Sequence, residues 1–585
     1  MKKTKIVCTI GPSSEDKAVF TQLVNQGLNV ARLNFSHGSH EEHLGRINMI
    51  KSVREETGAP IAIMLDTKGP EIRTGKFGVP VVTLVEGQAF TLTTEDFLGT
   101  QDKCQISYKG LPQDVVAGDK ILIDDGLVEL EVKSTTATEI ETVVLNAGDV
   151  KNNKGVNVPG VSINLPAITE KDKGDILFGI ENEIDFIAAS FIRKASDVLE
   201  IRKILEENGG EDIHIISKIE NQEGVDNLDE ILEVSDGLMV ARGDLGVEIP
   251  TEQVPLVQKS MIKKCNIEGK PVITATQMLD SMIRNPRPTR AETTDVANAI
   301  YDGTDAIMLS GETAAGKYPV EAVKTMALIA KTTEDSLNYQ QILREKAQSI
   351  TETGVTFAVS HATCTTANDL EAVAIVTSTA SGFTARKVAK FRPKAPIIAS
   401  CTNEQVRRKI ALVWGVYSLL TKEATSTDQI FEDSVELAKS EGYIKPGDLI
   451  VFTAGVPVGV AGATNLMKVE LVGENIIKGT GLGKELVVGN ACIVKSAADC
   501  KAKFKEGDII VTQATDRDMM DYIEKAAGLV VEEGGYTSHA AIVALNLKLP
   551  AIIGATSATE CVKDGEKLTL DSGKGILYVG ATRVL

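Results

Sequence analysis

His214–Glu220 has the sequence HIISKIE, and Gly237–Asp244 has the sequence GLMVARGD. Both are short apolar runs that end in charged residues, a pattern typical of strands buried on both faces of a parallel sheet. Six further runs of this kind occur at Lys5–Ile10, Asn29–Ser36, Ile61–Thr67, Asp185–Ile192, Pro271–Met278 and Ala306–Thr313. Helical patterns separate them; one opens at Thr251-Glu252 and closes at Gly269. Eight such units in succession predict an α/β fold, the TIM (β/α)8 barrel, with a doubly wound open sheet as the alternative.

One connection between the predicted strands is far too long for a βα loop. Residues 71–167 contain alternating apolar and polar stretches at Val79–Val85, Lys120–Ile123, Leu127–Val132 and Glu139–Val144. This pattern predicts an inserted small β-barrel domain. Because the insert leaves from the carboxyl end of a barrel strand, we expect it to act as a lid over the mouth of the barrel.

The chain after residue 340 predicts two further domains. Ala372–Thr379, Ala395–Thr402 and Asp448–Ala454 are the expected strands of a C-terminal α/β regulatory domain. Gly473–Gly483 (GENIIKGTGLG) is glycine-rich and is predicted to be a linker to an extra β-rich C-terminal domain. The predicted domains are the barrel at 1–70 and 168–340, the lid at 71–167, the α/β domain at 341–473 and the extra domain at 474–585.

Composition predicts a soluble cytoplasmic protein. No apolar run among the 585 residues reaches the ~18–20 residues that cross a membrane, and no signal peptide is evident. Eight scattered cysteines without a CxxC pair are typical of a reducing compartment. The formal net charge of −19 argues against nucleic acid as a partner. An anionic substrate must therefore be held by a local cluster of cations or by a metal.

Charged residues at the predicted strand ends form such a cluster. Lys218 and Glu220 are two residues apart on one strand, so their side chains point to the same face, and Asp244 ends the next run. Two carboxylates together with a substrate phosphate suit Mg²⁺ or Mn²⁺. Arg32 and Arg73 add cations that a phosphate needs. The set predicts metal-assisted phosphoryl transfer at the barrel mouth, with ordinary ion pairs around a rim as the alternative.

Seven motifs in the first part of the chain resemble those of pyruvate kinases. They are IVCTIGP at Ile6–Pro12, ARLNFSHG at Ala31–Gly38, LDTKGPEIRTG at Leu65–Gly75, SKIENQEG at Ser217–Gly224, MVARGDLGVEIP at Met239–Pro250, TATQMLDSMIRNPRPTR at Thr274–Arg290 and LSGETAAG at Leu309–Gly316. The resemblance extends in order over residues 1–473, the predicted lid included. It implies an allosteric glycolytic enzyme, a homotetramer, that moves phosphate from phosphoenolpyruvate to ADP and gives ATP and pyruvate.

The resemblance also implies roles for single residues. Glu220 and Asp244 match ligands of Mg²⁺ (or Mn²⁺), and Lys218 matches the lysine that stabilises the phosphoryl group and the enolate. The residues that match contacts to phosphoenolpyruvate are Arg32, Lys218, Gly243, Asp244 and Thr276. Of these, Arg32, Lys218 and Thr276 are the implied catalytic residues. Thr276 matches a position near the face of the enolate that is protonated. Those that match K⁺ ligands are Asn34, Ser36, Asp66 and Thr67, and Glu71 matches the K⁺-dependent form of its motif. Those that match positions near the nucleotide are Asn34, His37, Arg73 and Lys154.

A hydroxyl-rich turn and a helix start follow Ala372–Thr379. The turn resembles the effector-phosphate loop of pyruvate kinases, and the helix N-terminus is a place where phosphate binds well. The candidate effector-binding residues are Thr379, Ser381, Gly382, Thr384 and Arg386. The effector would be a phosphorylated small molecule, either a sugar phosphate or a nucleotide; a plain helix cap is the alternative.

The last domain contains the sequence EGGYTSH at Glu533–His539. It resembles the mobile phosphohistidine domain of phosphoenolpyruvate-utilising enzymes, and His539 aligns with the histidine that is phosphorylated there. No ATP-grasp partner domain is evident in the sequence. We therefore favour a domain that packs without reacting over a phosphoryl carrier, and His539 remains a possible phosphohistidine.

Two other functions are open at this stage. The first is a barrel lyase or aldolase that stabilises a pyruvate enolate with Mg²⁺, against which Arg73, Lys154 and the lid argue. The second is a non-enzymatic sensor or phosphocarrier, against which the intact set Lys218, Glu220 and Asp244 argues. His37, His40 and His43 recur every three residues, and for them we favour a solvated first helical turn over a zinc site.

Overall fold

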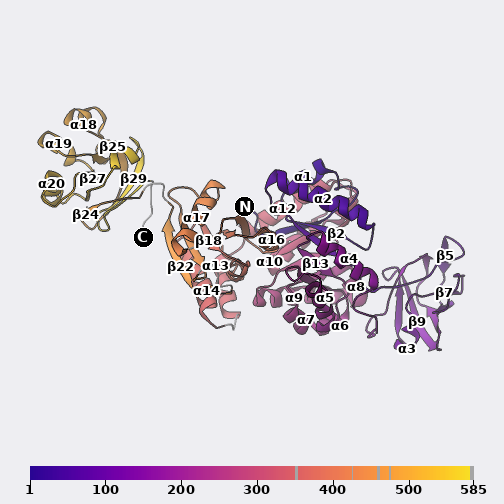
Figure 1. Cartoon of the computed structure of the whole chain (residues 1–585). Helices are drawn as coiled ribbons and strands as arrows, with labels where there is room; N and C mark the ends of the chain where they lie inside the picture. The colour runs from indigo at the N-terminus through magenta and orange to yellow at the C-terminus, as the bar shows by residue number, and fades with distance from the viewer. Residues whose placement is uncertain (350–352, 425, 458–461, 473–475, 580–585) are drawn as a thin grey trace. The chain divides into compact units, whose positions relative to one another are not determined.

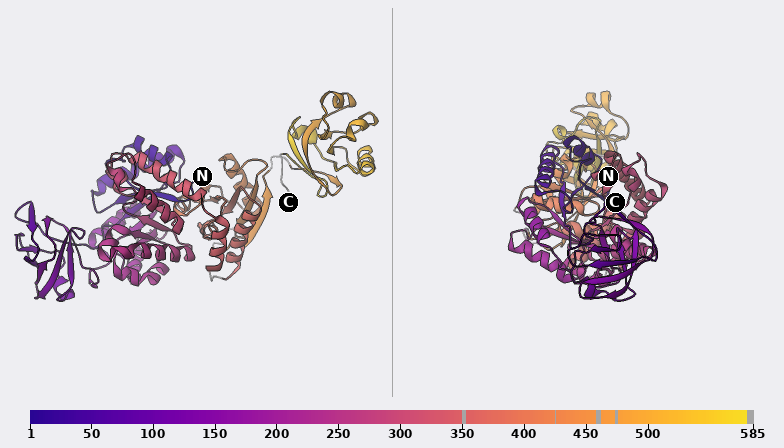
Figure 2. Two further views of the ribbon diagram at one scale, coloured as in Figure 1. Left: turned by 180° about the vertical axis from the view of Figure 1, so that it is seen from behind. Right: turned by 90° about the vertical axis from the view of Figure 1, so that its right-hand side faces the viewer.

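The computed structural model describes residues 1–349, 353–424, 426–457, 462–472 and 476–579. They form two compact units, Met1–Phe357 with Thr379–Leu420 and Ala358–Ser378 with Thr421–Leu585. Figures 1 and 2 show the helices and strands of both units. None of the helices in the described part of the chain has both the length and the apolar character needed to cross a bilayer.

Eight parallel strands close into a barrel in the first unit, as predicted, and helices surround them (Figures 1 and 2). The ring order is β1-β17-β16-β15-β14-β13-β3-β2. The strands are β1 Lys5–Thr9, β2 Val30–Asn34, β3 Ala62–Asp66, β13 Phe186–Ala189, β14 His214–Ile219, β15 Gly237–Ala241, β16 Val272–Ala275 and β17 Ala306–Leu309. Each strand is shorter than its predicted run because residues at the carboxyl end belong to the following loop or helix. Arg242, Gly243 and Asp244, for example, begin a helix.

The helices of the barrel include short extra turns at the strand ends. They are α1 Lys17–Asn25, α2 His40–Thr57, α4 Glu170–Glu181, α5 Ala195–Glu207, α6 Gln222–Asp226, α7 Leu228–Val234, α8 Arg242–Glu248, α9 Val254–Glu268, α10 Arg290–Asp302, α11 Gly311–Ala314, α12 Pro319–Asp335 and α13 Tyr339–Ser349, with 3-10 turns at Thr251–Gln253 and Asp280–Ile283. Capping boxes start α2 at Ser39, α4 at Thr169 and α10 at Thr289. The predicted helix at Thr251 begins as a 3-10 turn that leads into α9.

A repeated side-chain pattern fixes the amino ends of the barrel strands. One Asn or Asp precedes every second strand, and its side chain accepts the backbone N–H of the first or second residue of the neighbouring strand. The pairs are Asn29 with Ile6, Asp185 with Ile63, Asp236 with Ile215 and Asp305 with Val272, at 3.0, 2.8, 2.8 and 3.1 Å. The backbone N–H of each Asn or Asp donates to the carbonyl of the same partner at 2.9–3.1 Å. Because side chains alternate along a strand, this fourfold clamp sets which of them reach the opposite end of the barrel.

The insert is a β domain with its own apolar core, as predicted. Its elements are β4 Ile72–Arg73, β5 Val81–Leu84, β6 Ala89–Thr93, β7 Lys103–Gln105, α3 Leu111–Asp114, β8 Lys120–Ile123, β9 Val128–Thr135, β10 Glu139–Val144, β11 Gly148–Lys151 and β12 Gly155–Asn157. Seven strands follow the order β4-β12-β8-β9-β10-β6-β7, and β5 pairs with β11. An isolated bridge between Thr74 and Ile106 brings the two edge strands together.

The elements that follow the barrel have the predicted α/β character. In the first unit they are α15 Phe383–Ala389, β19 Ile397–Cys401, α16 Glu404–Lys409, a 3-10 turn at Ile410–Leu412 and β20 Val416–Leu420, and β19 pairs in parallel with β20. In the second unit β18 Ala374–Ser378 pairs in parallel with β21 Leu449–Ala454, and β22 Leu466–Leu471 is antiparallel to β21. Two helices complete the set, α14 Val355–Asp369 and α17 Thr427–Ser440. The strands β20 and β22 were not predicted from the sequence.

The last domain is built on an eight-stranded sheet of order β23-β30-β29-β25-β26-β27-β28-β24. Its elements are β23 Ile476–Lys478, β24 Thr480–Leu482, β25 Leu486–Ile493, α18 Ala497–Lys503, β26 Ile509–Thr512, a 3-10 turn at Arg517–Met519, α19 Met520–Ile523, β27 Gly528–Val531, α20 His539–Leu547, β28 Ala551–Ile553, α21 Ala558–Cys561, β29 Lys567–Asp571 and β30 Ile576–Val579.

The prediction that Gly473–Gly483 is a linker is wrong for its described residues, because β23 and β24 occupy this segment. Residues 473–475 lie outside the described residues. Its glycines permit close packing rather than flexibility. A Cβ at Gly481 would lie 2.1 Å from the Ser572 carbonyl oxygen, and one at Gly479 would lie 2.5 Å from that of Ile553. Glycine is therefore required where these strands meet their neighbours.

Candidate active site at the barrel mouth

Three oxygens hold Lys218 at the carboxyl end of β14. Its Nζ lies 3.1 Å from Asp66, 3.0 Å from Glu220 and 2.8 Å from the Ser190 hydroxyl. Burial alone would lower the pKa of this ammonium, but the charges of Asp66 and Glu220 outweigh burial and raise it. Lys218 is therefore a permanent, fixed cation at the mouth of the barrel.

Asp66 joins Lys218 to a second cation. Its other carboxylate oxygen accepts Arg32 Nε at 2.6 Å, while Arg32 NH1 donates to the Thr9 hydroxyl at 2.7 Å. Burial acts to raise the pKa of Asp66, but the charges of Arg32 and Lys218 exceed that effect and the pKa is lowered. An ionised Asp66 thus keeps both cations in place, and the prediction that these strand ends converge is confirmed for Arg32, Asp66, Lys218 and Glu220.

Glu220 is almost completely buried, and each of its oxygens has a partner. One accepts the backbone N–H of Phe191 at 2.6 Å, and the other faces Lys218. Burial raises the pKa of Glu220 to about 7, although Lys218 opposes the rise; Asp244 adds to it. Two neighbouring carboxylates with hard oxygens fit a divalent cation. In the described part of the chain no group of three or more His, Cys, Asp or Glu side chains has a metal-binding arrangement.

Thr276 occupies a strained turn directly after β16. Thr276 and Gln277 have φ values of 73° and 55°, in a region that a β-branched residue rarely adopts and that clusters at functional sites. Arg242 holds the turn by donating to the carbonyls of Ala275 and Thr276 at 3.0 and 2.7 Å. A Cβ at Gly243 would lie 2.8 Å from Thr276 Cγ2. Gly243 and Thr276 therefore adjoin, and only glycine leaves the turn undisturbed.

The four residues predicted to bind K⁺ lie at the ends of β2 and β3. Asn34 accepts the Ser36 N–H at 3.1 Å, and the Thr67 hydroxyl accepts the Ser190 N–H at 3.1 Å. The hydroxyl of Ser190 in turn donates to the Thr67 carbonyl at 2.7 Å. Hard oxygens of this kind are suitable ligands for an alkali cation, and Asp66 supplies the negative charge.

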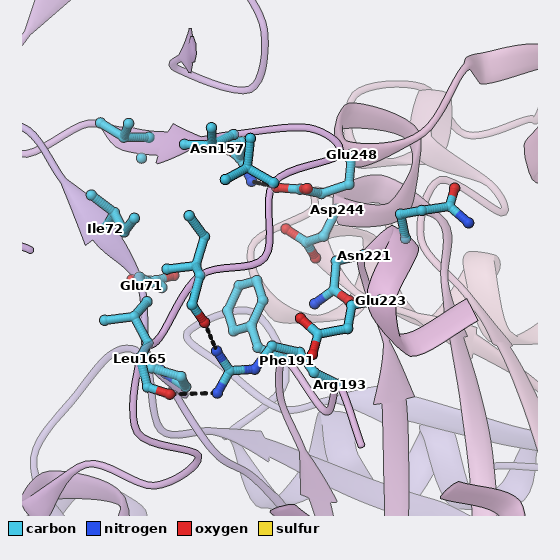
Figure 3. A pocket seen from close by; sticks show the side chains of 18 of the residues that line it. Glu71, Ile72, Asn157, Leu165, Phe191, Arg193, Asn221, Glu223, Asp244 and Glu248 are labelled. Atoms are coloured by element: carbon cyan, nitrogen blue, oxygen red, sulfur yellow. Dashed lines mark hydrogen bonds between the residues drawn. The ribbon is translucent and has the colours of Figure 1, made fainter. Parts of the chain in front are cut away.

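A cavity of about 440 Å³ lies between the strand ends and the lid (Figure 3). Asp244 lines it from the barrel, and Arg73 and Lys154 line it from the lid. Arg73 pairs with Glu71 at 2.7 Å and Lys154 with Asp124 at 2.9 Å. The barrel and the lid also meet directly, since Asn157 donates to Glu248 at 2.7 Å (Figure 3).

The three histidines near the start of α2 differ in their surroundings. His43 is buried, stacks on Phe35 at 3.9 Å between ring centroids and lies 2.8 Å through Nε2 from the His37 carbonyl. His40 pairs with Asp175 at 2.7 Å, and His37 is exposed. The prediction of a solvated helical turn is therefore wrong for His43, which supports the loop that carries Ser36 and His37.

Three residues that contact this site or the lid were not predicted: Ser190, Phe191 and Arg193, on the loop after β13. Ser190 contacts Lys218, Phe191 contacts Glu220, and Arg193 donates to the Ile163 carbonyl of the lid. The fourth predicted strand, Asp185–Ile192, ends in an apolar residue, so the search for charged strand ends did not select it. The available signal was Ser190, a hydroxyl at the same strand-end position as the polar residues of the other runs.

The candidate effector loop precedes α15 and lies in the first unit. Gly382 is the N-cap residue with φ of 78°, and a Cβ there would lie 2.5 Å from Ile410 Cγ2. Thr379 and Thr384 are buried and Ser381 is exposed. Arg386 NH1 lies 3.5 Å from the Ser381 carbonyl. The turn thus has the glycine and helix start predicted for it.

In the second unit His539 begins α20 and is exposed, with Ser538 as the N-cap. Its Nδ1 lies 2.8 Å from the Thr515 hydroxyl. This contact orients the ring and leaves Nε2 as the nitrogen available to solvent.

To catalyse phosphoryl transfer, a protein must mainly position the reacting groups and compensate the negative charge of the phosphoryl group. Here a permanent lysine cation is fixed beside two carboxylates, and the adjoining cavity is covered by a domain that can exclude water. The fold and the site define a barrel phosphotransferase with a lid.

Comparison with known proteins identifies the family. The model described as pyruvate kinase, barrel domain, matches residues 1–323, and that described as pyruvate kinase, alpha/beta domain, matches 357–470. The model of the PEP-utilising enzyme, mobile domain, matches 504–575. The pyruvate kinases of Geobacillus stearothermophilus and Bacillus licheniformis are each 56% identical to this chain, over 586 and 587 residues and 100% of both chains.

A solved structure of a pyruvate kinase from Cryptosporidium parvum matches with a TM-score of 0.77 and 41% identity, over 80% of this chain and 96% of that one. The chain belongs to the pyruvate kinase family. It is a phosphotransferase that moves the phosphoryl group of phosphoenolpyruvate to ADP, giving ATP and pyruvate in the last step of glycolysis. The barrel lyase and the non-enzymatic sensor are thereby set aside.

Proposed function

We propose that the phosphoryl group is transferred beside Lys218, with Glu220 and Asp244 holding the divalent cation. The observation that supports this most directly is the fixed position of Lys218 Nζ between Asp66, Glu220 and Ser190. A cation so placed compensates charge on the phosphoryl group and then on the enolate without having to move. Mg²⁺ or Mn²⁺, when bound, would neutralise phosphate charge and align the reacting oxygens.

Arg32, Gly243 and Thr276 complete the site for phosphoenolpyruvate. Arg32 has one face engaged by Asp66 and Thr9, which orients the guanidinium toward a single binding direction. Gly243 lets the backbone approach the substrate, and the Thr276 hydroxyl lies on the face where the enolate takes its proton. The strain at Thr276 supports this role, because strained residues persist where function requires a fixed geometry.

On the nucleotide side, Arg73 and Lys154 of the lid bind ADP phosphates together with His37 and Asn34. Asn34, Ser36, Asp66 and Thr67 hold K⁺. Support comes from their placement: Arg73 and Lys154 line the cavity, and Asp66, one of the proposed K⁺ ligands, lies 3.1 Å from Lys218. Binding of ADP between lid and barrel would close the cavity over the reacting groups.

The proposal also covers regulation, assembly and compartment. Thr379, Ser381, Gly382, Thr384 and Arg386 form the site of a phosphorylated effector; their support is a glycine-capped helix start with hydroxyls and an arginine. We propose a cytoplasmic homotetramer with the domain boundaries 1–70, 71–167, 168–340, 341–473 and 474–585. For His539 we propose a retained but non-reacting domain, although the Thr515 contact leaves phosphorylation at Nε2 open.

A coupled assay tests these assignments. Purified enzyme is given phosphoenolpyruvate and ADP with and without Mg²⁺, K⁺ and candidate effectors, and pyruvate is followed. Pyruvate formation should require ADP and a divalent cation and should rise with K⁺. Pyruvate formation that does not depend on ADP would contradict the proposal and favour a lyase.

A further inference from the structure

The loop Ser190–Arg193 touches two residues of the phosphoryl-transfer site through adjacent positions. The Ser190 hydroxyl accepts a hydrogen bond from Lys218 at 2.8 Å, and the Phe191 N–H donates to Glu220 at 2.6 Å. Phe191 has φ of 55°, a strained conformation for a bulky residue. Since neighbouring contacts must hold the loop in this strained form, a shift of the loop would move both Lys218 and Glu220.

Arg193, two residues further on, extends from this loop to the lid (Figure 3). Its side chain is largely buried, with NH1 donating to the carbonyl of Ile163 and NH2 to that of Leu165, both at 2.6 Å. These carbonyls belong to the segment by which the lid returns to the barrel, after β12 and before α4. The planar fork of arginine matches two carbonyls two residues apart on an extended chain.

The backbone of Arg193 is fixed to the barrel. Its N–H donates to Asp197 at 3.0 Å, and its carbonyl accepts the Asn227 side chain at 2.9 Å. Its Nε lies 3.7 Å from Asp197 and, among the residues that the structure describes, has no hydrogen-bond partner. Both terminal nitrogens of the guanidinium are therefore committed to the lid, while its own backbone belongs to the barrel.

We propose that Arg193 is a positioning residue that couples the lid to Lys218 and Glu220. Displacement of the return segment is passed through the guanidinium to the loop, and from Ser190 and Phe191 to the lysine and the carboxylate. The inference rests on the roles proposed above for Lys218 and Glu220. It adds a reason why the lid and the charged site act together: closure of the lid would position the loop Ser190–Arg193, and the same loop orients Lys218 and Glu220.

The test uses Arg193→Lys and Arg193→Ala in the full-length enzyme, with Arg407→Lys as the matched control. Arg407 also donates to a backbone carbonyl, that of Gly58 at 2.6 Å, but Gly58 ends α2 and precedes β3, at the opposite end of the barrel. The Arg193 variants should lose about tenfold or more in kcat, since small misplacements of reacting groups have effects of this size. KM for ADP should rise, and hydrogen exchange should increase in peptides covering 158–168. The Arg407→Lys enzyme should keep kcat within about twofold.

Two further measurements separate coupling from a merely structural role. The affinity for Mn²⁺ alone, followed by electron paramagnetic resonance, should fall by about tenfold, because the loop that orients Glu220 is no longer held by the lid. Guanidinium added to Arg193→Ala should restore part of kcat, whereas ethylammonium at the same K⁺ concentration should not. If Arg193→Ala does not fold, the lysine variant alone decides.

The proposal is overturned if folded Arg193→Lys keeps kcat within about twofold, or loses kcat without faster exchange at 158–168. A lower melting temperature with unchanged kcat also overturns it. Lys218→Met is assayed in parallel: an inactive Lys218→Met beside a fully active Arg193→Lys refutes the coupling alone, whereas an active Lys218→Met refutes the proposed site itself.

Discussion

Substituting Lys218 by methionine removes one charge from a balanced set of four. Lys218 and Arg32 are the cations, Asp66 and Glu220 are the anions, and the ion pairs among them are 2.6 to 3.1 Å long. Methionine keeps the length and the apolar stem of lysine, so packing is retained. Asp66 keeps Arg32 as a partner, whereas Glu220 keeps only the Phe191 N–H. The variant should therefore fold, and the pKa of Glu220 should lie above its native value of about 7, because Lys218 no longer opposes the effect of burial.

We expect Lys218→Met to lower turnover strongly and to change the binding of the divalent cation and of phosphoenolpyruvate only slightly. A cation that stabilises the transferring phosphoryl group accounts for about 10³–10⁵ in kcat, which is about 4–7 kcal/mol of transition-state stabilisation. At a pH where Glu220 is ionised, the divalent cation should bind Lys218→Met at least as well as the native enzyme, because Glu220 no longer shares its charge with the lysine. Phosphoenolpyruvate retains Arg32 and the metal, so its affinity should fall by no more than about tenfold.

The measurement combines steady-state kinetics with binding of Mn²⁺ by electron paramagnetic resonance and of phosphoenolpyruvate by calorimetry. Lys270→Met is the control, since Lys270 is also partly buried and bonds the carbonyls of Leu232 and Glu233 at 2.7 and 2.9 Å, remote from the barrel mouth. Its kcat should change by less than about twofold. A folded Lys218→Met with near-native kcat would refute the role assigned to Lys218.

Three further predictions concern other parts of the chain. Gly243→Ala places a Cβ 2.8 Å from Thr276 Cγ2. Overpacking of this kind costs about 1–3 kcal/mol and is relieved by movement of the Thr276 turn, so kcat should fall by about tenfold in steady-state assays while KM for ADP stays unchanged. An unchanged kcat would contradict the close fit. Burial lowers the pKa of His214 to about 4, with Asp236 opposing, so the unfolded chain binds a proton between pH 6.5 and 4 that the folded chain does not. Stability should fall as the pH drops through this window, by at most about 1.4 kcal/mol per pH unit, and His214→Gln should lose less between pH 6.5 and 4.5 in urea titrations; equal losses would contradict it. His539→Ala should keep native kcat, and phosphoenolpyruvate should leave no acid-labile label on the native enzyme; a label that disappears in His539→Ala would show that the domain reacts.

The barrel could be predicted because its strands are buried on both faces and are therefore continuous apolar runs. The strands β20 and β22 could not, for different reasons. β20 (VYSLL) follows β19 after a short helix, and β22 (LMKVEL) mixes apolar and charged residues on a partly exposed edge. The linker prediction at Gly473–Gly483 failed because glycine has two uses. It can loosen a chain, or it can allow two backbones to approach, and only the neighbours reveal which.

For the site, the types of residue were predictable and their connections were not. Because side chains alternate along a strand, the two-residue spacing of Lys218 and Glu220 predicted that they share a face. The bridging of Arg32 and Lys218 by Asp66 required the strand order β2-β3-β13-β14, which brings residues from distant parts of the sequence to the same end of the barrel. The left-handed φ of Thr276 follows from the Arg242 clamp on its carbonyl, and no local sequence rule for threonine predicts that conformation.

The amino ends of the strands constrain this chemistry as strongly as the carboxyl ends. Along β14, Ile216 packs inside the barrel, whereas Ile215 and Ile219 pack beneath the helices. By the same alternation Lys218 points into the mouth, and a slip of one residue would replace it there with an apolar or hydroxyl side chain. The side chain of Asp236 prevents that slip by binding the Ile215 N–H at 2.8 Å. The position of Lys218 is therefore set three residues away, at a clamp that lies outside the proposed site.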